Sequence, residues 1–204
     1  MLSSKFGVGN SQFRVASLSG YVDTVPFGAF RREVFQKYGG YDERLIRNQD
    51  NEMNYRIRKS GGKIYLANDI KFTYYCRDTI KGISDMAFSN GMWNIVTMRL
   101  CPGAMSLRHF VPLLFLLSIF VLCLLGTVYE AFFWLLLIDL CAYIILDFLF
   151  SRKAAGTIKE AAMLLALFPI FHFSYGIGSV KGIVKVIAMP YHREAPAHYE
   201  SKSN

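Results

Sequence analysis

Three long apolar stretches in the carboxyl-terminal half constrain the fold of this chain more than any other feature. They cover residues 109–125, 131–150 and 161–177. A helix needs about 20 apolar residues to cross the roughly 30 Å hydrocarbon core of a bilayer. The second stretch is long enough by itself, the first is at the short end, and Pro169 interrupts the third. We therefore expect residues 109–180 to form an all-α membrane region of two to three hydrophobic helices.

Positive charges predict how these stretches are oriented. Five basic residues flank the first two stretches: Arg99, Arg108, Arg152, Lys153 and Lys159. The positive-inside rule places these residues in the cytoplasm, so the first two stretches cross outward and back. A third full crossing would carry the basic tail, residues 181–204, outside, against the rule. A re-entrant or interfacial segment bent at Pro169 would keep the tail inside. We predict a multi-pass protein of the inner or plasma membrane with residues 1–108 in the cytoplasm.

Composition argues against several other classes of protein. The 204 residues carry a formal net charge of +8, and 53% of them are hydrophobic. Lysine and arginine are spread along the chain without a basic cluster interleaved with aromatic residues, so we expect no nucleic-acid partner. The four cysteines show no C-x-x-C spacing, which argues against a zinc site or a disulfide framework.

Two helical patterns occupy the segment VPFGAFRREVFQKYGGYDERLIRNQDNEMNYRIRKSGGK, residues 25–63. The first covers Phe30–Tyr38 and stops at the pair Gly39-Gly40. The second follows Asn48, which we predict to be its N-cap, and stops at Gly61-Gly62. The helix dipole favours acids in the first turn, and a carboxylate held there suits a general base. The alternative is that these acids are ordinary first-turn residues.

Short strands and one longer helix complete the amino-terminal half. Tyr21–Val25, Lys63–Leu66 and Lys71–Tyr75 read as strands, and their alternation with helices predicts an incomplete α/β layer. Ile80–Leu100 has a rough apolar stripe and lies in a region, residues 79–108, that we predict to be amphipathic. It could lie on the membrane surface or serve as an ordinary core helix.

The order of "GAFRREVF", "GGYDE" and "QDNEMNYRIRKSGGKI" resembles family 2 glycosyltransferases, in particular the membrane-anchored branch that includes succinoglycan-type exopolysaccharide transferases. The motif positions that match the acceptor-site segment of that family are Gly28, Arg32, Gly39, Gly40, Tyr41, Asp42 and Glu43. Gln49-Asp50 stands where the family usually has Glu-Asp. The resemblance implies that residues 1–78 are the carboxyl-terminal part of an α/β, GT-A-type catalytic domain.

The activity implied by the resemblance is inverting transfer of a sugar from a nucleotide diphosphate sugar to a hydroxyl of a glycan or lipid-linked acceptor, in the synthesis of a cell-surface polysaccharide or glycolipid. Asp50 is the implied catalytic base, and Arg77 is a candidate contact to the donor phosphates. The implied acceptor-binding residues are Gly28, Arg32, Gly40, Tyr41, Asp42 and Glu52.

The family also implies a Mg²⁺ or Mn²⁺ ion held by a D-x-D motif, but this sequence contains no D-x-D. No metal ligand is therefore predicted, and we expect an amino-terminal, nucleotide-binding half to be missing from these residues. The alternative function, from a different class, is a non-catalytic membrane scaffold or truncated remnant that binds a partner subunit.

Asp139 lies near the middle of the second apolar stretch. A carboxylate at that depth costs at least about 2.5 kcal/mol, so it needs a partner or a wet cavity. We name His172 as a possible partner. The acid could line a channel for a sugar chain, or its hydrogen bond could simply fix helix packing.

Overall fold

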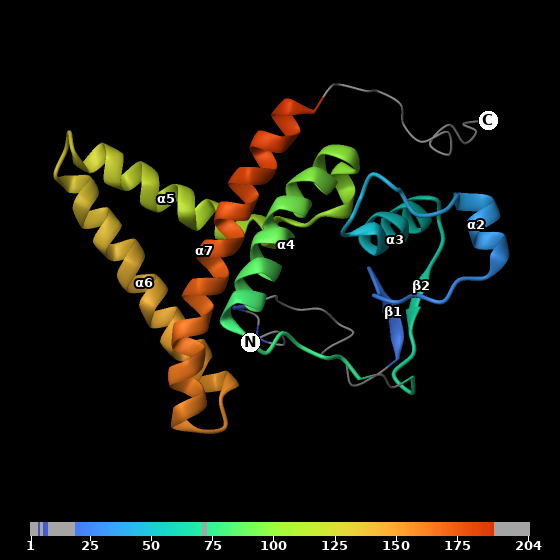
Figure 1. Cartoon of the computed structure of the whole chain (residues 1–204), viewed down its shortest axis with the longest axis horizontal. Helices are drawn as coiled ribbons and strands as arrows, with labels where there is room; N and C mark the ends of the chain where they lie inside the picture. The colour runs from blue at the N-terminus through green and yellow to red at the C-terminus, as the bar shows by residue number, and fades with distance from the viewer. Residues whose placement is uncertain (1–3, 5, 8–18, 71–72, 190–204) are drawn as a thin grey trace.

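The computed structural model describes residues 4, 6–7, 19–70 and 73–189, and these residues form a mostly helical protein (Figure 1). The elements in chain order are β1 Gly20–Val22, α2 Arg32–Tyr38, α3 Gln49–Lys59, β2 Ile64–Leu66, α4 Ile80–Leu100, the 3-10 turns η1 Pro102–Ala104 and η2 Leu107–Phe110, α5 Val111–Gly126, α6 Ala131–Ala154 and α7 Ile158–Ala188.

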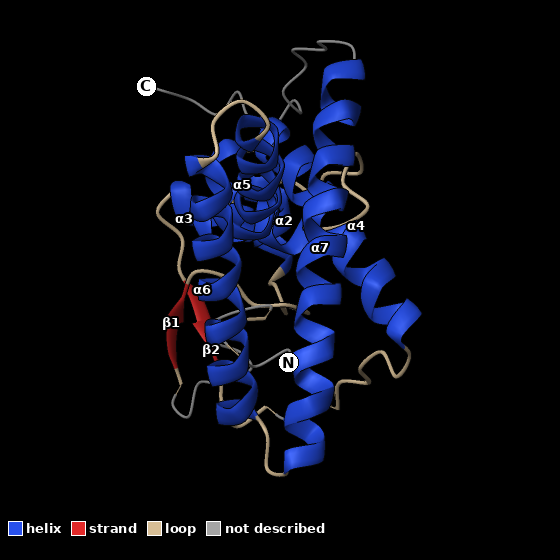
Figure 2. Cartoon of the chain, turned by 90° about the vertical axis from the view of Figure 1, so that its left-hand side faces the viewer, coloured by secondary structure: helices blue, strands red, loops and turns tan. Residues whose placement is uncertain are grey.

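The amino-terminal module, residues 19–70, contains a single small sheet in its described structure. β1 and β2 pair antiparallel with Tyr21 opposite Tyr65, and Figure 2 shows them side by side at one edge of the helices. Behind the sheet, Met53 and Ile57 of α3 pack with Ile64 in a buried cluster that α2 completes. The expected α/β layer is therefore present only as helices on a two-stranded ribbon.

The third predicted strand is wrong for residues 73–75, which are irregular, whereas residues 71–72 lie outside the described part. Tyr74 and Tyr75 are exposed, so no apolar surface selects an extended conformation there. Aromatic residues favour strands only where a sheet face can pack against them.

Glycines end both helices of the module as predicted. α2 stops at Gly39, whose φ of 79° is a left-handed conformation that glycine adopts at little cost. α3 is followed by Ser60 and then Gly61 with φ 81°, and the N–H of Gly62 returns to the Ile57 carbonyl at 2.9 Å. These local signals need no partner from elsewhere in the chain.

Helix α4 has the predicted bounds, and it packs in parallel along α7 with the two backbones in contact. A Cβ added to Gly178 would lie 2.0 Å from the carbonyl oxygen of Phe88, and one added to Gly182 would lie 2.6 Å from that of Met92. On the α4 side, a Cβ at Gly91 would lie 2.0 Å from the Tyr175 carbonyl oxygen. The close helix approach expected at these α7 glycines is confirmed, and α4 is the partner.

In the described part of the chain, three helical segments are long and apolar enough to cross a membrane: Leu107–Gly126, Ala131–Ala154 and Ile158–Ala188. Pro169 interrupts the apolar sequence of the third segment but not its helix, because α7 is a single helix through that position. A proline removes one backbone hydrogen bond. Its neighbours Phe168 and Phe171 are almost completely buried, and this packing keeps the helix continuous.

Candidate functional site

Asp50, the predicted base, is the second residue of α3 and is half-buried. Its Oδ1 accepts a hydrogen bond from the backbone N–H of Asn51 at 2.9 Å. Among the described residues no cation forms an ion pair with it. Burial raises the pKa of Asp50 above its ordinary value, against the smaller effect of the backbone hydrogen bonds. A carboxylate with a raised pKa accepts protons better than an ordinary exposed aspartate.

Asn48 immediately precedes α3, as predicted, but its side chain does not cap the helix. It adopts the left-handed conformation with φ 65°, and its Nδ2 points to α4. There the amide donates to Asn94 Oδ1 at 2.7 Å and to Thr97 Oγ1 at 3.1 Å. The predicted capping bond is therefore wrong: the left-handed backbone of Asn48 differs from the extended conformation of an N-cap residue, and its side-chain amide binds α4.

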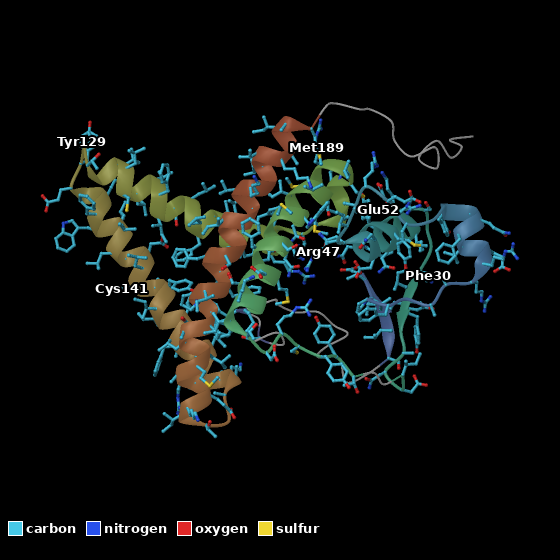
Figure 3. All side chains as sticks on the ribbon, viewed as in Figure 1. Phe30, Arg47, Glu52, Tyr129, Cys141 and Met189 are labelled. Atoms are coloured by element: carbon cyan, nitrogen blue, oxygen red, sulfur yellow. The ribbon has the colours of Figure 1, made fainter. Side chains whose placement is uncertain are left out.

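A polar network therefore joins the start of α3 to two further helices. Arg47, labelled in Figure 3 on the side of the module that faces α4, donates to Asn90 Oδ1 at 2.5 Å. Asn94 in turn donates to the hydroxyl of Tyr175 on α7. Sequence reasoning missed this network. Its signal was the spacing of Asn90, Asn94 and Thr97, which places these three polar residues on one face of the helix.

Glu52 points away from solvent and is bound by Arg56 along the same face of α3. The guanidinium donates from Nε to Oε1 at 3.0 Å and from Nη2 to Oε2 at 2.8 Å. The guanidinium also donates from Nη1 to the carbonyl oxygen of Tyr38 and from Nη2 to that of Gly40. Both residues are buried, so this clamp ties the loop after α2 to α3.

Asp42 belongs to the same loop and is held by Arg44. The guanidinium donates to Oδ1 from Nε at 2.9 Å and to Oδ2 from Nη2 at 2.7 Å. Burial alone would raise the pKa of Asp42, but the hydrogen bonds and charge of Arg44 outweigh burial and lower it. Asp42 is therefore a fixed, ionised group at the edge of the loop.

The other predicted site residues lie at several places. Tyr41 is exposed beside the ring of Phe35, Gly28 is half-buried against Phe30, and Arg32 is exposed at the start of α2. Arg77 is exposed in the irregular segment before α4. The structure thus brings Gly40 and Glu52 together through Arg56, with Asp42 two residues further along the loop. Within the described residues no hydrogen bond or ion pair links Asp50 to any of these groups.

The described residues do not fit a catalytic metal ion. No group of three or more His, Cys, Asp or Glu side chains lies close enough together in that part of the chain to hold one. Asp50 and Glu52 cannot serve as a pair, because Arg56 occupies both oxygens of Glu52.

The predicted pairing of Asp139 with His172 is wrong. Asp139 Oδ2 lies 2.8 Å from the Ser118 hydroxyl, which joins α6 to α5. His172 contacts the Tyr143 hydroxyl at 2.9 Å and the Phe6 carbonyl oxygen at 2.6 Å. The bond made by Asp139 is of the interhelical kind expected for a packing role.

Taken together, these features define a protein in which a small module carrying a half-buried acid is fixed to helices long and apolar enough to cross a membrane. The chain is 31% identical over 114 residues to the succinoglycan biosynthesis protein ExoA of Rhizobium meliloti (strain 1021). The match covers 54% of this chain and 34% of that protein, so the chain is a distant and partial homologue spanning about a third of its relative. No protein-family model matches the chain. No solved structure matches it either.

Proposed function

We propose that this chain forms the acceptor side and the membrane platform of a family 2 inverting glycosyltransferase. The enzyme would transfer a sugar from a nucleotide diphosphate sugar to a hydroxyl of a glycan or lipid-linked acceptor, in the synthesis of a cell-surface polysaccharide or glycolipid. The relationship to a succinoglycan biosynthesis protein supports the class of product. The observation that carries the proposal is the half-buried Asp50 at the start of α3, with its raised pKa.

In the proposed reaction, the acceptor hydroxyl attacks the anomeric carbon of the donor from the face opposite the nucleotide. The new glycosidic C–O bond forms while the bond to the diphosphate breaks, and the nucleotide diphosphate leaves with that electron pair. The Asp50 carboxylate takes the hydroxyl proton. The loop with Gly40, Tyr41 and Asp42 would orient the acceptor, held by the Arg56 clamp. Glu52 is left out of the acceptor contacts, because its carboxylate is buried against Arg56.

The proposal assigns no step to a metal ion, although the family implies Mg²⁺ or Mn²⁺ at the donor phosphates. Whether this chain binds the nucleotide donor must therefore be measured independently of the role of Asp50. Calorimetric titration of the detergent-purified chain with uridine diphosphate and Mn²⁺ answers this question. Residues 1–78 would supply the acceptor side, and Arg77 remains a candidate for the donor phosphates.

The test of the base role is the substitution Asp50→Asn in the protein expressed in its native context. Polysaccharide production and sugar transfer from a panel of labelled nucleotide sugars are measured in isolated membranes. We expect transfer to fall by about 10²–10⁴-fold, the usual contribution of a general base, with protein level unchanged. The matched control is Asp69→Asn, which neutralises an exposed aspartate of the same module.

Full transfer by the Asp50→Asn variant would remove Asp50 from the base role. Production that depends on the presence of the chain, but not on Asp50, would support the alternative function of a non-catalytic membrane scaffold.

A further inference from the structure

Helix α7 separates two parts of the molecule. In Figure 1 it runs between the α5–α6 hairpin on one side and α4 with the amino-terminal module on the other. The contacts agree with this view. Gly176 of α7 lies against Pro112 and Leu116 of α5, whereas Gly178 and Gly182 lie against α4. Helix α7 therefore lies at the boundary between the apolar α5–α6 hairpin and the polar module, and this holds for any orientation of the protein in a bilayer.

Helix α4 carries charges that belong in water. Lys81 and Asp85 form an exposed ion pair at 2.6 Å, and the next turns bind Arg47 and Asn48 of the module. A charged side chain in the hydrocarbon core costs several kcal/mol, so α4 stays outside that core.

The carboxyl-terminal half of α7 accompanies α4 over most of its length. The Ser84 and Ser174 hydroxyls meet at 2.8 Å near one end. Near the other end, the Lys185 ammonium lies 4.2 Å from the centroid of the Trp93 ring. Because the two helices are parallel and their backbones touch, this half of α7 stays outside the hydrocarbon core together with α4.

The same half of α7 exposes an apolar stripe that no described residue covers. Ile177, Val180, Val184 and Ile187 recur at helical spacing and are between 39% and 78% exposed. By helical periodicity the stripe lies on the same side as Gly176, which contacts α5.

Two lysines border this stripe, Lys181 and Lys185. An apolar stripe with flanking lysines is typical of helices that lie in the membrane interface, and the stripe is continuous with the side from which α5 enters the bilayer. The lipid surface therefore fits the stripe by both hydrophobicity and charge.

A larger share of α7 than of α5 or α6 is buried against other parts of the protein. Of the most apolar window in each segment, 39% is buried in α7, compared with 11% for the segment containing α5 and 6% for α6. Protein packing thus explains the high hydropathy of α7 without a bilayer crossing.

From these observations we infer that α7 does not cross the membrane but lies along its cytoplasmic surface, with the stripe Ile177, Val180, Val184 and Ile187 in contact with lipid. The basic residues at the α6–α7 junction, Arg152, Lys153 and Lys159, and the carboxyl-terminal tail are then on the same side. The protein has two spans, α5 and α6. This inference does not depend on the proposed enzymatic activity.

Reporter fusions test the topology. Green fluorescent protein and alkaline phosphatase are each joined after Tyr129, after Ala155 and after Asn204 of the chain. We expect cytoplasmic signals, fluorescent and phosphatase-negative, at positions 155 and 204, and the opposite signals at 129. If α7 crosses the bilayer, position 204 will instead report the same compartment as position 129, and the inference is overturned.

A photo-crosslinking residue at Val184 tests the occupant of the stripe in intact membranes, and one at Ile95 is the control because that α4 side chain is buried. We expect a lipid adduct at position 184 and none at 95. A band of twice the molecular mass from position 184 would show a second copy of the chain on the stripe and would overturn the lipid contact.

Discussion

Replacement of Arg56 by methionine should destabilise the amino-terminal module strongly. The guanidinium neutralises Glu52, and Glu52 is only 2% exposed. Removal of one partner from a buried ion pair usually costs about 3–5 kcal/mol, because the other charge stays buried without compensation. For a chain of 150–250 residues each kcal/mol lowers the unfolding midpoint by about 2–4 °C, so the expected shift is about 6–20 °C.

The assay is thermal unfolding of the detergent-purified chain, followed by intrinsic fluorescence. Arg58→Met is a matched control on the same helix, since Arg58 pairs at 3.3 Å with Asp23, which is 87% exposed, and such pairs contribute about 0–1 kcal/mol. The double variant Glu52→Leu with Arg56→Met should regain most of the lost stability, because no unpaired charge remains. If Arg56→Met shifts the midpoint no more than Arg58→Met, the clamp is not desolvated. Glu52 then returns as a candidate acceptor contact.

Three further predictions concern single positions. Gly178→Ala should lower the free energy of unfolding by about 1–3 kcal/mol, because its Cβ would collide with the Phe88 carbonyl of α4, whereas Gly20→Ala, with open space around it, should have little effect on the midpoint. Asn48→Gly should cost about 1 kcal/mol less than Asn48→Ala in the same assay, since both lose the bonds to α4 but only alanine is strained at φ 65°. Asp50→Asn should raise the unfolding midpoint at pH 7, because the raised pKa of Asp50 means that ionisation opposes folding. This gain should shrink as the pH falls below the ordinary aspartate pKa of about 4, where Asp50 is protonated in both states, and a gain that persists there would contradict the reasoning.

Features determined by nearby residues could be predicted from the sequence. The ends of α2 and α3 follow from Gly39 and Gly61, whose left-handed conformations other residues adopt only with strain. The bounds of α4 and the existence of three apolar helices follow from the pattern of hydrophobic residues. The succinoglycan-type resemblance was also readable from the motif order, and the partial match to ExoA agrees with it.

Features that depend on distant partners could not be predicted. Asn48 had a local role available as an N-cap, yet its amide binds Asn94 and Thr97, which lie more than forty positions further along the chain. Asp139 likewise binds Ser118 and not His172, because helix pairing places α5 next to that turn of α6. The first-turn position of Glu52 suggested a solvent-facing acid, and only the fold reveals Arg56 and the two loop carbonyls around it.

The amino-terminal module is small, so the hydrogen bonds that join it to α4 are important for its stability. Its sheet has two strands of three residues each, and a two-stranded ribbon is only marginally stable alone. The bonds from Arg47 and Asn48 to α4, and from Asn94 to Tyr175, attach this module to the longest helix of the protein. Hydrogen bonds link Tyr175 on α7 through Asn94 to Asn48, and Asp50, the candidate base, follows Asn48 by two residues along the backbone. The position of that acid relative to the long apolar helices is therefore set by the α4–α7 pair.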